Sequence, residues 1–365
     1  MISLQKKPTT MIVHQAHPLN AGSPLDIMRE SFFTPQQSFF IRNHGTIPTI
    51  DGNSFRLSVT GMVERALELS LDELRAKFPF VTVPATLQCA GSRRDELTSV
   101  RPIPGELPWG AEPVSTSLWG GVPLRNILQA AGIATSAAHV AFIGMDEIQK
   151  NEQKFGFGGS IPIEKALSAE VLLAYEMNGE PLTAAHGFPL RMIVPGYIGA
   201  RSVKWLANIH IQDCPSHNYY QTHAYKLFPD SVDADNVVWE KGQTLAEIPL
   251  NAVICQPQQG AVLTAGPQTI RGYALARAGH YIERVELSID EGKTWTEARL
   301  LEPEHRWAWR FWESNLSLDA GTCQIIVRAW DTSGQAQPVE SGPLWNFKGY
   351  LNNAWYRCTV FVQAQ

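Results

Sequence analysis

The chain has 365 residues, a formal net charge of −5 at pH 7, 44% hydrophobic residues and 18% charged residues. This composition is typical of a globular protein long enough for about two domains. There is no basic excess and no run of lysines and arginines, so the sequence argues against binding to nucleic acid and against attachment to a membrane.

The first half of the chain alternates short helix and strand signals. Residues 1–24 are polar and contain prolines, and we interpret them as an N-terminal arm. The apolar run 38–45 predicts a strand that ends at a glycine turn. Residues 70–74 begin a short helix with an acidic first turn. Residues 81–88 predict a strand that delivers Cys89 to a loop.

Residues 102–121 are rich in glycine and proline and predict long loops over a scaffold, where functional sites commonly lie. Residues 122–132 form an amphipathic pattern that stops at Gly132, which predicts a helix. The glycine-rich segment 154–160 lacks the spacing and the strand-to-helix context of a dinucleotide-binding loop.

Basic residues interrupt the apolar strands between residues 186 and 206, at Arg191, Arg201 and Lys204. Such residues can protect the edge of a sheet against aggregation, or they can line a site for an anionic ligand. The sequence pattern alone leaves both interpretations open.

The composition changes after about residue 247. The rest of the chain consists of short alternating runs with turn signals, including a hairpin signal that joins 285–289 to 294–296. Short strands with almost no helix signal are typical of an immunoglobulin-like sandwich. We therefore predict an α+β domain over residues 25–247, followed by an all-β immunoglobulin-like domain over residues 248–365.

The five cysteines are widely spaced, and none forms a C-x-x-C pair, so they indicate neither a disulfide framework nor a zinc site. Free thiols are typical of a reducing compartment. The chain shows no apolar signal region at its start and no apolar run of membrane-spanning length. These features predict a cytoplasmic protein, with a periplasmic location left open.

Cys89 is followed at once by small residues and then by Arg93 and Arg94. Free cysteine is most often a buried, inert thiol. A thiolate beside fixed positive charge also suits a metal ligand or a nucleophile, although no local pattern supplies a histidine base or further soft ligands. The residues alone leave the three interpretations open.

Several segments together resemble the sulfite oxidase family. Residues 88–94 are similar to that family's C-A-G-N-R-R segment, and the resemblance continues in order, at compatible spacings, over nearly the whole chain from about residue 25. The other similar segments are 42–44, 186–191, 203–206, 345–349 and 353–357.

The resemblance implies a molybdenum–molybdopterin cofactor with Cys89 as the only protein ligand of the metal. A thiolate is a soft donor, and the pterin dithiolene would supply further sulfurs. Buried cations would bind the pterin phosphate through charge-assisted hydrogen bonds. By motif, the cofactor-binding residues are Phe40, Ile41, Arg42, Asn43, His44, Asp146, His186, Arg191, Ser202, Val203 and Lys204.

The resemblance also implies oxidation of sulfite to sulfate by oxygen-atom transfer. Paired arginine donors would hold the dianion, and a tyrosine hydroxyl would bind one of its oxygens. The implied catalytic residues are Arg42, Arg94, Trp109, Tyr225 and Lys348. Lys348 stands where the family usually has a third substrate arginine, so the charge is kept but the bidentate fork is lost.

Two other functions are carried as alternatives. Segments 42–45, 109–111 and 191–193 look closer to nitrate reductases of the same fold, which predicts a reductase of nitrate or another oxyanion. Those enzymes, however, tend to have asparagine where Tyr225 stands. A cofactor-free interaction module is the third. In the sulfite-oxidising hypothesis the second domain pairs two subunits into a homodimer. Because the chain has no room for a haem domain, electrons would pass to an external acceptor such as a cytochrome.

Overall fold

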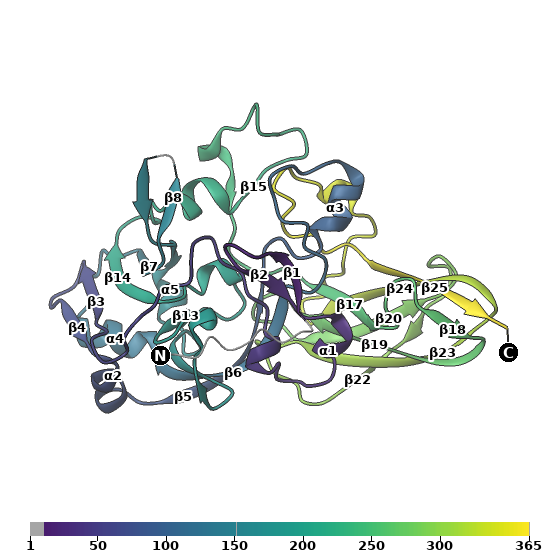
Figure 1. Ribbon diagram of the computed structural model, residues 1–365, viewed down its shortest axis with the longest axis horizontal. Helices are drawn as coiled ribbons and strands as arrows, with labels where there is room; N and C mark the ends of the chain where they lie inside the picture. Colours follow the sequence, from purple (N-terminus) through teal and green to yellow (C-terminus); the bar gives the residue numbers. More distant parts are fainter. Residues whose placement is uncertain (1–10, 151, 365) are drawn as a thin grey trace.

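Figure 1 shows two lobes side by side: one of strands and short helices, and one all-strand lobe that contains the C-terminal strands. The computed structural model describes residues 11–150 and 152–364. The order of the lobes along the chain confirms the predicted fold class, an α+β domain followed by an immunoglobulin-like sandwich.

The first lobe is built on two sheets. In the first sheet β14 pairs parallel with β3 and antiparallel with β7. The order across this sheet is β10 (Gly158–Pro162), β7 (His139–Gly144), β14 (Leu206–Gln212), β3 (Leu57–Gly61) and β4 (Leu67–Leu69). The second sheet runs β12 (Glu180–Pro181), β11 (Leu172–Met177), β6 (Val114–Pro123) and β5 (Val81–Gln88), with β13 (Arg191–Ile193) also pairing with β11.

The main core of this lobe lies between the two sheets. Leu57 and Phe142 come from the first sheet, Val122 and Leu173 from the second, and all four are fully buried. Because successive side chains of a strand point to opposite faces, half of the side chains of the second sheet point away from this core, on the opposite face. That face carries a separate apolar cluster, which includes Cys89.

The structure confirms the helices predicted from residue 70 and over residues 122–132. Helix α2 (Leu71–Lys77) begins at Ser70, whose hydroxyl accepts from the Glu73 amide at 3.1 Å while the Glu73 carboxylate accepts from the Ser70 amide at 3.0 Å. This reciprocal pair satisfies two amides that the helix cannot. Helix α4 (Leu124–Ala131) ends at Gly132, with a φ of 70°. The other helices are α1 (Leu25–Met28), α3 (Arg94–Val100) and α5 (Ile163–Ala166).

The predicted loop over residues 102–121 is wrong in its second half. Residues 114–123 form β6, the longest strand of the lobe, which pairs with β5 on one side and β11 on the other. Glycine serves here as a close-approach residue, since a Cβ on Gly121 would lie 2.0 Å from the Leu173 carbonyl oxygen. Glycine in a strand can therefore mark tight backbone packing as well as a turn.

The interpretation of residues 1–24 as an arm is also wrong where the structure describes them; residues 1–10 lie outside the described residues. Strands β1 (Ile12–Gln15) and β2 (Asn20–Gly22) form a hairpin, and Asn20 and Ala21 are buried. Ala21 pairs with Ile41, which leaves Ile41 in a single bridge instead of the predicted strand over 38–45. The backbone hydrogen bonds between Ala21 and Ile41 hold the hairpin against the loop that contains Ile41.

The second lobe is a sandwich of two antiparallel-rich sheets. Glu286 pairs with Glu297, which confirms the predicted hairpin. Inward residues such as Trp312, Val285 and Val360 are fully buried between the sheets. One sheet runs β17 (Asn251–Gln256), β19 (Gly266–Leu275), β23 (Arg310–Leu318) and β22 (Arg299–Leu300); the other runs β18 (Val262–Thr264), β25 (Tyr356–Gln363), β24 (Gly321–Asp331), β20 (Ile282–Ser288) and β21 (Thr296–Glu297).

The segment before β25 returns from the sandwich to the first lobe. Figure 1 shows it as a yellow loop beside α3. The Trp345 indole donates to the Arg101 carbonyl at 2.9 Å, and the Leu351 amide donates to the Ala90 carbonyl at 2.8 Å. These contacts bring Lys348 next to the loop that follows Cys89.

Short hairpins complete the description: β8 (Ile148–Lys150) with β9 (Gln153–Phe155), and β15 (Lys226–Leu227) with β16 (Gln243–Thr244). None of the helices within the described residues has the length and apolar character needed to cross a bilayer.

Candidate active site

A pocket opens in the first lobe beside the end of β5. Its empty volume, counted out to the solvent opening, is about 680 Å³, which is in the range of cofactor and small-molecule sites. Strand ends and loops from distant parts of the sequence supply its walls. It is lined by Phe39, Phe40, Arg42, Asn43, His44, Leu87, Cys89, Ala90, Asp146, Phe157, His186, Arg191, Gly199, Ala200, Ser202, Val203, Lys204, Trp205 and Tyr225.

Cys89 is the first residue after β5, and its free thiol reaches the pocket wall. Its amide donates to the Pro113 carbonyl at 2.9 Å, and its carbonyl accepts from the Ser92 amide at 3.0 Å. Both backbone groups are thus fixed, so the thiol is presented by a rigid turn. A thiolate held in this way is a soft donor for a metal carried by a bound group.

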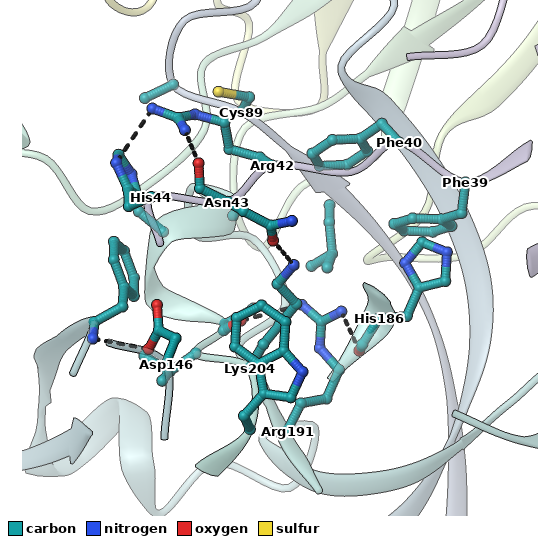
Figure 2. Close-up of a pocket in the computed structure, with 18 of the residues that line it drawn as sticks. Phe39, Phe40, Arg42, Asn43, His44, Cys89, Asp146, His186, Arg191 and Lys204 are labelled. Carbon is teal, nitrogen blue, oxygen red and sulfur yellow. Dashed lines mark hydrogen bonds between the residues drawn. The ribbon is translucent and has the colours of Figure 1, made fainter. Parts of the chain in front are cut away.

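Asp146, His186, Arg191 and Lys204 form one end of the pocket, which we call the cofactor end. Figure 2 shows them on the side away from Cys89. Arg191 donates to the carbonyls of His186 and Ser202, at 3.0 Å each, and the Lys204 ammonium donates to the Ala185 carbonyl at 2.9 Å and to the Asn43 side chain. Neutral backbone oxygens therefore orient these cations without cancelling their charge.

Burial makes the positive charge at the cofactor end costly. Burial lowers the pKa of Arg191 to about 9, and burial together with the cations Lys204 and Arg191 lowers that of His186 to about 3. Burial, with Arg191 and Arg42 nearby, also holds the pKa of Lys204 well below its ordinary value. Such a site is stabilised when an anion enters it.

The donor set fits a pterin cofactor with a phosphate. Among the described residues that line the pocket, Arg42, Arg191 and Lys204 bring positive charge and Asp146 is the carboxylate. Asp146 accepts from the Phe157 amide at 2.9 Å and lies near enough to act on Lys204. The excess of donors suits a phosphate, and the single thiol suits a metal whose other donors belong to the cofactor.

Arg42, His44 and Tyr225 form a hydrogen-bonded chain on the other side of the pocket. Arg42 Nη2 lies 3.3 Å from His44 Nδ1, and His44 Nε2 lies 2.8 Å from the Tyr225 hydroxyl. Burial and the neighbouring cations hold the pKa of His44 well below its ordinary value, so the ring is neutral. Its Nδ1 accepts from Arg42, which carries no acceptor.

The protonation of His44 fixes the role of Tyr225. With Nδ1 accepting, the His44 proton lies on Nε2 and is donated to the Tyr225 oxygen. Burial above all raises the pKa of Tyr225, so its hydroxyl stays protonated. The hydroxyl hydrogen is left free to donate into the pocket. Arg42 and Tyr225 therefore present a cation and a hydrogen-bond donor to the same pocket as Cys89.

Arg94 and Lys348 meet outside the pocket lining, at a carboxylate that the sequence interpretation overlooked. The Lys348 ammonium contacts Glu106, and Arg94 Nη2 lies 3.7 Å from the other oxygen of the same carboxylate. We call Arg94, Glu106 and Lys348 the anion cluster. Arg94 also donates to the carbonyls of Lys348, at 3.0 Å, and Leu107, at 2.7 Å.

The side chain of Arg94 lies in a slot that only glycine permits. A Cβ on Gly91 would lie 2.3 Å from Arg94 Nη2, and a Cβ on Gly349 would lie 2.5 Å from Arg94 Cγ. Gly349 also has a φ of 60°, a conformation that favours glycine. The two glycines, far apart in sequence, fix the path of this arginine toward the cluster.

Trp109 and Ile41 were predicted at the site but do not belong to its lining. Trp109 is fully buried, packs 4.5 Å from the His14 ring between ring centroids, and has an indole nitrogen without a hydrogen-bond partner in the described residues. Ile41 contributes backbone hydrogen bonds to Ala21. Both residues lie next to the lining residues without facing the pocket, Trp109 through packing and Ile41 through backbone hydrogen bonds.

Apart from Arg94 and Lys348, which meet at Glu106 outside the lining, the structure brings the remaining predicted residues together in one pocket. Residues of the lining that sequence reasoning missed are Phe39, Leu87, Ala90, Phe157, Gly199, Ala200 and Trp205. Asn20 was also missed; its Oδ1 accepts from Arg42 at 3.2 Å and from the Asn43 amide at 2.8 Å. Their positions beside the recognised motifs were the available signal for Phe39, Ala90 and Trp205.

Comparison with known proteins agrees with this geometry. Residues 44–220 match the model of the oxidoreductase molybdopterin binding domain, and residues 242–363 match that of the Mo-co oxidoreductase dimerisation domain. Sulfite oxidase of Gallus gallus is 42% identical over 355 residues, which cover 94% of this chain and 76% of that protein. The chain belongs to the sulfite oxidase family.

Other members and neighbours differ in what accompanies this unit. Nitrate reductase [NADH] 2 of Phaseolus vulgaris is 39% identical over 95% of this chain but only 41% of its own length. The crystal structure of the sulfane dehydrogenase SoxCD from Paracoccus pantotrophus superposes with a TM-score of 0.79 at 25% identity, covering 98% of this chain and 86% of that one. The two-lobed sulfite oxidase fold is therefore shared across these proteins.

Membership of the sulfite oxidase family makes this chain a molybdopterin-dependent oxidoreductase. Lys204, Arg191, His186 and Cys89 all line the pocket; the first three would hold the anionic part of the cofactor, and Cys89 would bind the molybdenum. This excludes the interaction module without a cofactor as a description of the chain. The basic residues between strands are lining residues at Arg191 and Lys204, whereas Arg201 is buried outside the lining.

Proposed function

We propose that this protein oxidises sulfite to sulfate. The overall reaction takes sulfite and water to sulfate, two protons and two electrons. When bound at Cys89, the molybdenum cofactor supplies oxygen-atom transfer and takes up the two electrons. The observation that carries the proposal is that Arg42 and Tyr225 line the same pocket as Cys89 and lie near enough to interact electrostatically with its sulfur.

The protein residues bind and orient the anion. Arg42 supplies a permanent positive charge, and its orientation is set by the Asn20 side chain, the Asn43 carbonyl and His44. Tyr225 donates its free hydroxyl hydrogen to a substrate oxygen, because His44 already occupies the oxygen of that hydroxyl. Fixed donors of this kind hold a substrate in the reactive orientation without reorganisation.

We further propose an external electron acceptor, such as a cytochrome, and a homodimer formed through the second lobe. The match of residues 242–363 to a dimerisation domain supports the homodimer. The five cysteines are free, which fits a reducing compartment, and the cytoplasm is the location we propose. The acceptor would then be soluble or membrane-bound on that side.

A second candidate is reduction of nitrate or another oxyanion on the same fold. Lys348 favours it, because an ammonium keeps the charge of an arginine but cannot bind an oxyanion through a two-pronged fork. Tyr225 favours sulfite, because the nitrate reductases that the chain resembles tend to have asparagine at this position. One preparation can be assayed for both reactions.

The test uses purified protein loaded with molybdenum to about one atom per chain. We expect sulfite-dependent reduction of ferricyanide, with two ferricyanide ions reduced per sulfate formed. The same preparation, reduced with a viologen dye, should consume nitrate much more slowly. Absence of sulfite turnover from fully loaded protein would exclude the proposed function, and fast nitrate consumption would establish the second candidate.

A further inference from the structure

The anion cluster contains a carboxylate where the proposed function needs free cations. Glu106 contacts the Lys348 ammonium through one oxygen and lies 3.7 Å from Arg94 through the other. The side chains are sheltered, with exposed fractions of 17% for Glu106, 20% for Lys348 and 4% for Arg94. Water therefore screens these charges less than it screens an ordinary surface pair.

The charge of Glu106 extends to the pocket itself. Burial is the main cause of the raised pKa of Tyr225 and of Tyr350, and the Glu106 carboxylate raises both further. The same carboxylate acts favourably on Arg42. Glu106 thus lies close enough to the substrate-binding wall for its negative charge to oppose an incoming anion.

The position of Glu106 in the chain allows an external anion to take its place at the two cations. It belongs to the irregular segment between α3 and Trp109, and its side chain reaches Lys348 across 242 positions of sequence. A carboxylate on such a segment can exchange with an external oxyanion that offers the same kind of acceptor oxygens to the same two cations.

We propose that Glu106 is a specificity-determining residue that competes with the substrate anion for Lys348 and Arg94. Binding of an oxyanion is then an exchange in which the carboxylate is displaced. This inference rests on the proposed function, together with the substrate role for Lys348 and Arg94 that the resemblance to the sulfite oxidase family implies. A dianion regains more attraction from the two cations than the carboxylate gives up, whereas a monoanion such as nitrate regains little.

The experiment measures binding of sulfate, a dianion that the enzyme does not consume, to molybdenum-loaded protein by titration calorimetry. In Glu106→Gln the competing charge is absent while the side-chain shape is kept, so the sulfate Kd should fall about tenfold or more. Nitrate binding should tighten as well. An unchanged or weaker sulfate affinity in loaded Glu106→Gln would show that the carboxylate is a structural brace and would overturn the proposal.

Two controls separate competition from a general loss of negative charge. Glu302→Gln removes a carboxylate that pairs with Arg310 at 3.1 Å in the second lobe, and its sulfate Kd should stay within about twofold of the wild type. In a Lys348→Met background, Glu106→Gln should improve sulfate binding less than threefold, because the main object of the competition is gone. A full tenfold gain there would contradict the proposal.

Glu106→Asp keeps the charge but withdraws it from Lys348, and it serves if the glutamine variant fails to load. Its sulfate Kd should lie between the wild-type value and about one tenth of that value. An unchanged sulfate Kd would count against the proposal. Sulfate binding needs no turnover. A protein that fails to oxidise sulfite but binds sulfate more tightly as Glu106→Gln would therefore refute the proposed function and leave this inference standing.

Discussion

The cofactor end and the anion cluster treat positive charge in opposite ways. At the cofactor end, Arg191 and Lys204 are buried and oriented by neutral carbonyls, so their charge remains for a ligand. In the anion cluster, Lys348 is matched by the carboxylate of Glu106. A cofactor that stays bound can neutralise a buried cation permanently. A substrate leaves at every turnover, so a carboxylate of the protein that pairs with the cation between turnovers stabilises the site.

Cys89→Ser tests the metal ligand on which the function of both regions depends. An alcohol is a much poorer donor to molybdenum than a thiolate, so we expect loss of essentially all bound molybdenum and of sulfite oxidation. Metal analysis of purified protein measures the first and ferricyanide reduction the second. Full molybdenum content in Cys89→Ser would show that the metal is held elsewhere.

Lys204→Met tests the cofactor end. Removing a buried cation should lower the molybdopterin content of purified protein at least tenfold, because a charge-assisted donor to the anionic cofactor is lost. The cofactor-free protein should not be destabilised, since the desolvation cost of the ammonium disappears with it. Pterin content and thermal unfolding of the cofactor-free form measure the two effects. Normal content in the variant would remove Lys204 from the cofactor end.

His186 gives the cofactor end a pH signature. Its pKa is lowered to about 3, from 6.5 in the unfolded chain, so the unfolded chain binds the extra proton first. The contribution to stability is present above pH 6.5 and is lost as the pH falls toward 3. Relative to His186→Gln, cofactor-free wild type should lose about 2 kcal/mol between pH 6.5 and 5. Urea unfolding of both proteins at several pH values measures this. The prediction would be contradicted if the free energy of unfolding changed equally with pH in the two proteins.

The sequence predicted the cofactor end better than the anion cluster, and the reason is local. His186, Arg191 and Lys204 belong to short motifs at strand ends, and β13 and the loop before β14 bring them to one wall. Strand signals and the resemblance to the sulfite oxidase family were sufficient for these residues. Capping at Ser70 and the turn of the hairpin 285–297 were likewise local and were predicted.

The anion cluster depends on contacts that no local pattern encodes. Arg93 and Arg94 are adjacent, yet Arg93 is fully buried and bound to Glu96 and Asn251, whereas Arg94 is directed by Gly91 and Gly349 toward Glu106. Which arginine faces the site is decided partly by Asn251 and Gly349, both far from the two arginines in sequence. The proline and glycine around Glu106 predicted a loop but not the cation that it meets.

The same limit explains the errors at Trp109 and in the N-terminal segment. The β1–β2 hairpin is short and polar in sequence, but it supplies Asn20 to Arg42 and His14 to Trp109. Its order comes from packing on the site and not from its own pattern. Strand β6 was read as a loop because the close approach of neighbouring strands, which requires glycine, becomes visible only in three dimensions.

The central claim is that the two regions serve different ligands, and Lys348→Met tests it most directly. Molybdenum content and kcat/KM for sulfite should be measured on the same preparation. We predict wild-type molybdenum content and a decrease of at least tenfold in kcat/KM, because a substrate cation is lost and Glu106 is left without its partner. Loss of molybdenum, or full content with unchanged kcat/KM, would contradict the assignment of the anion cluster to the substrate.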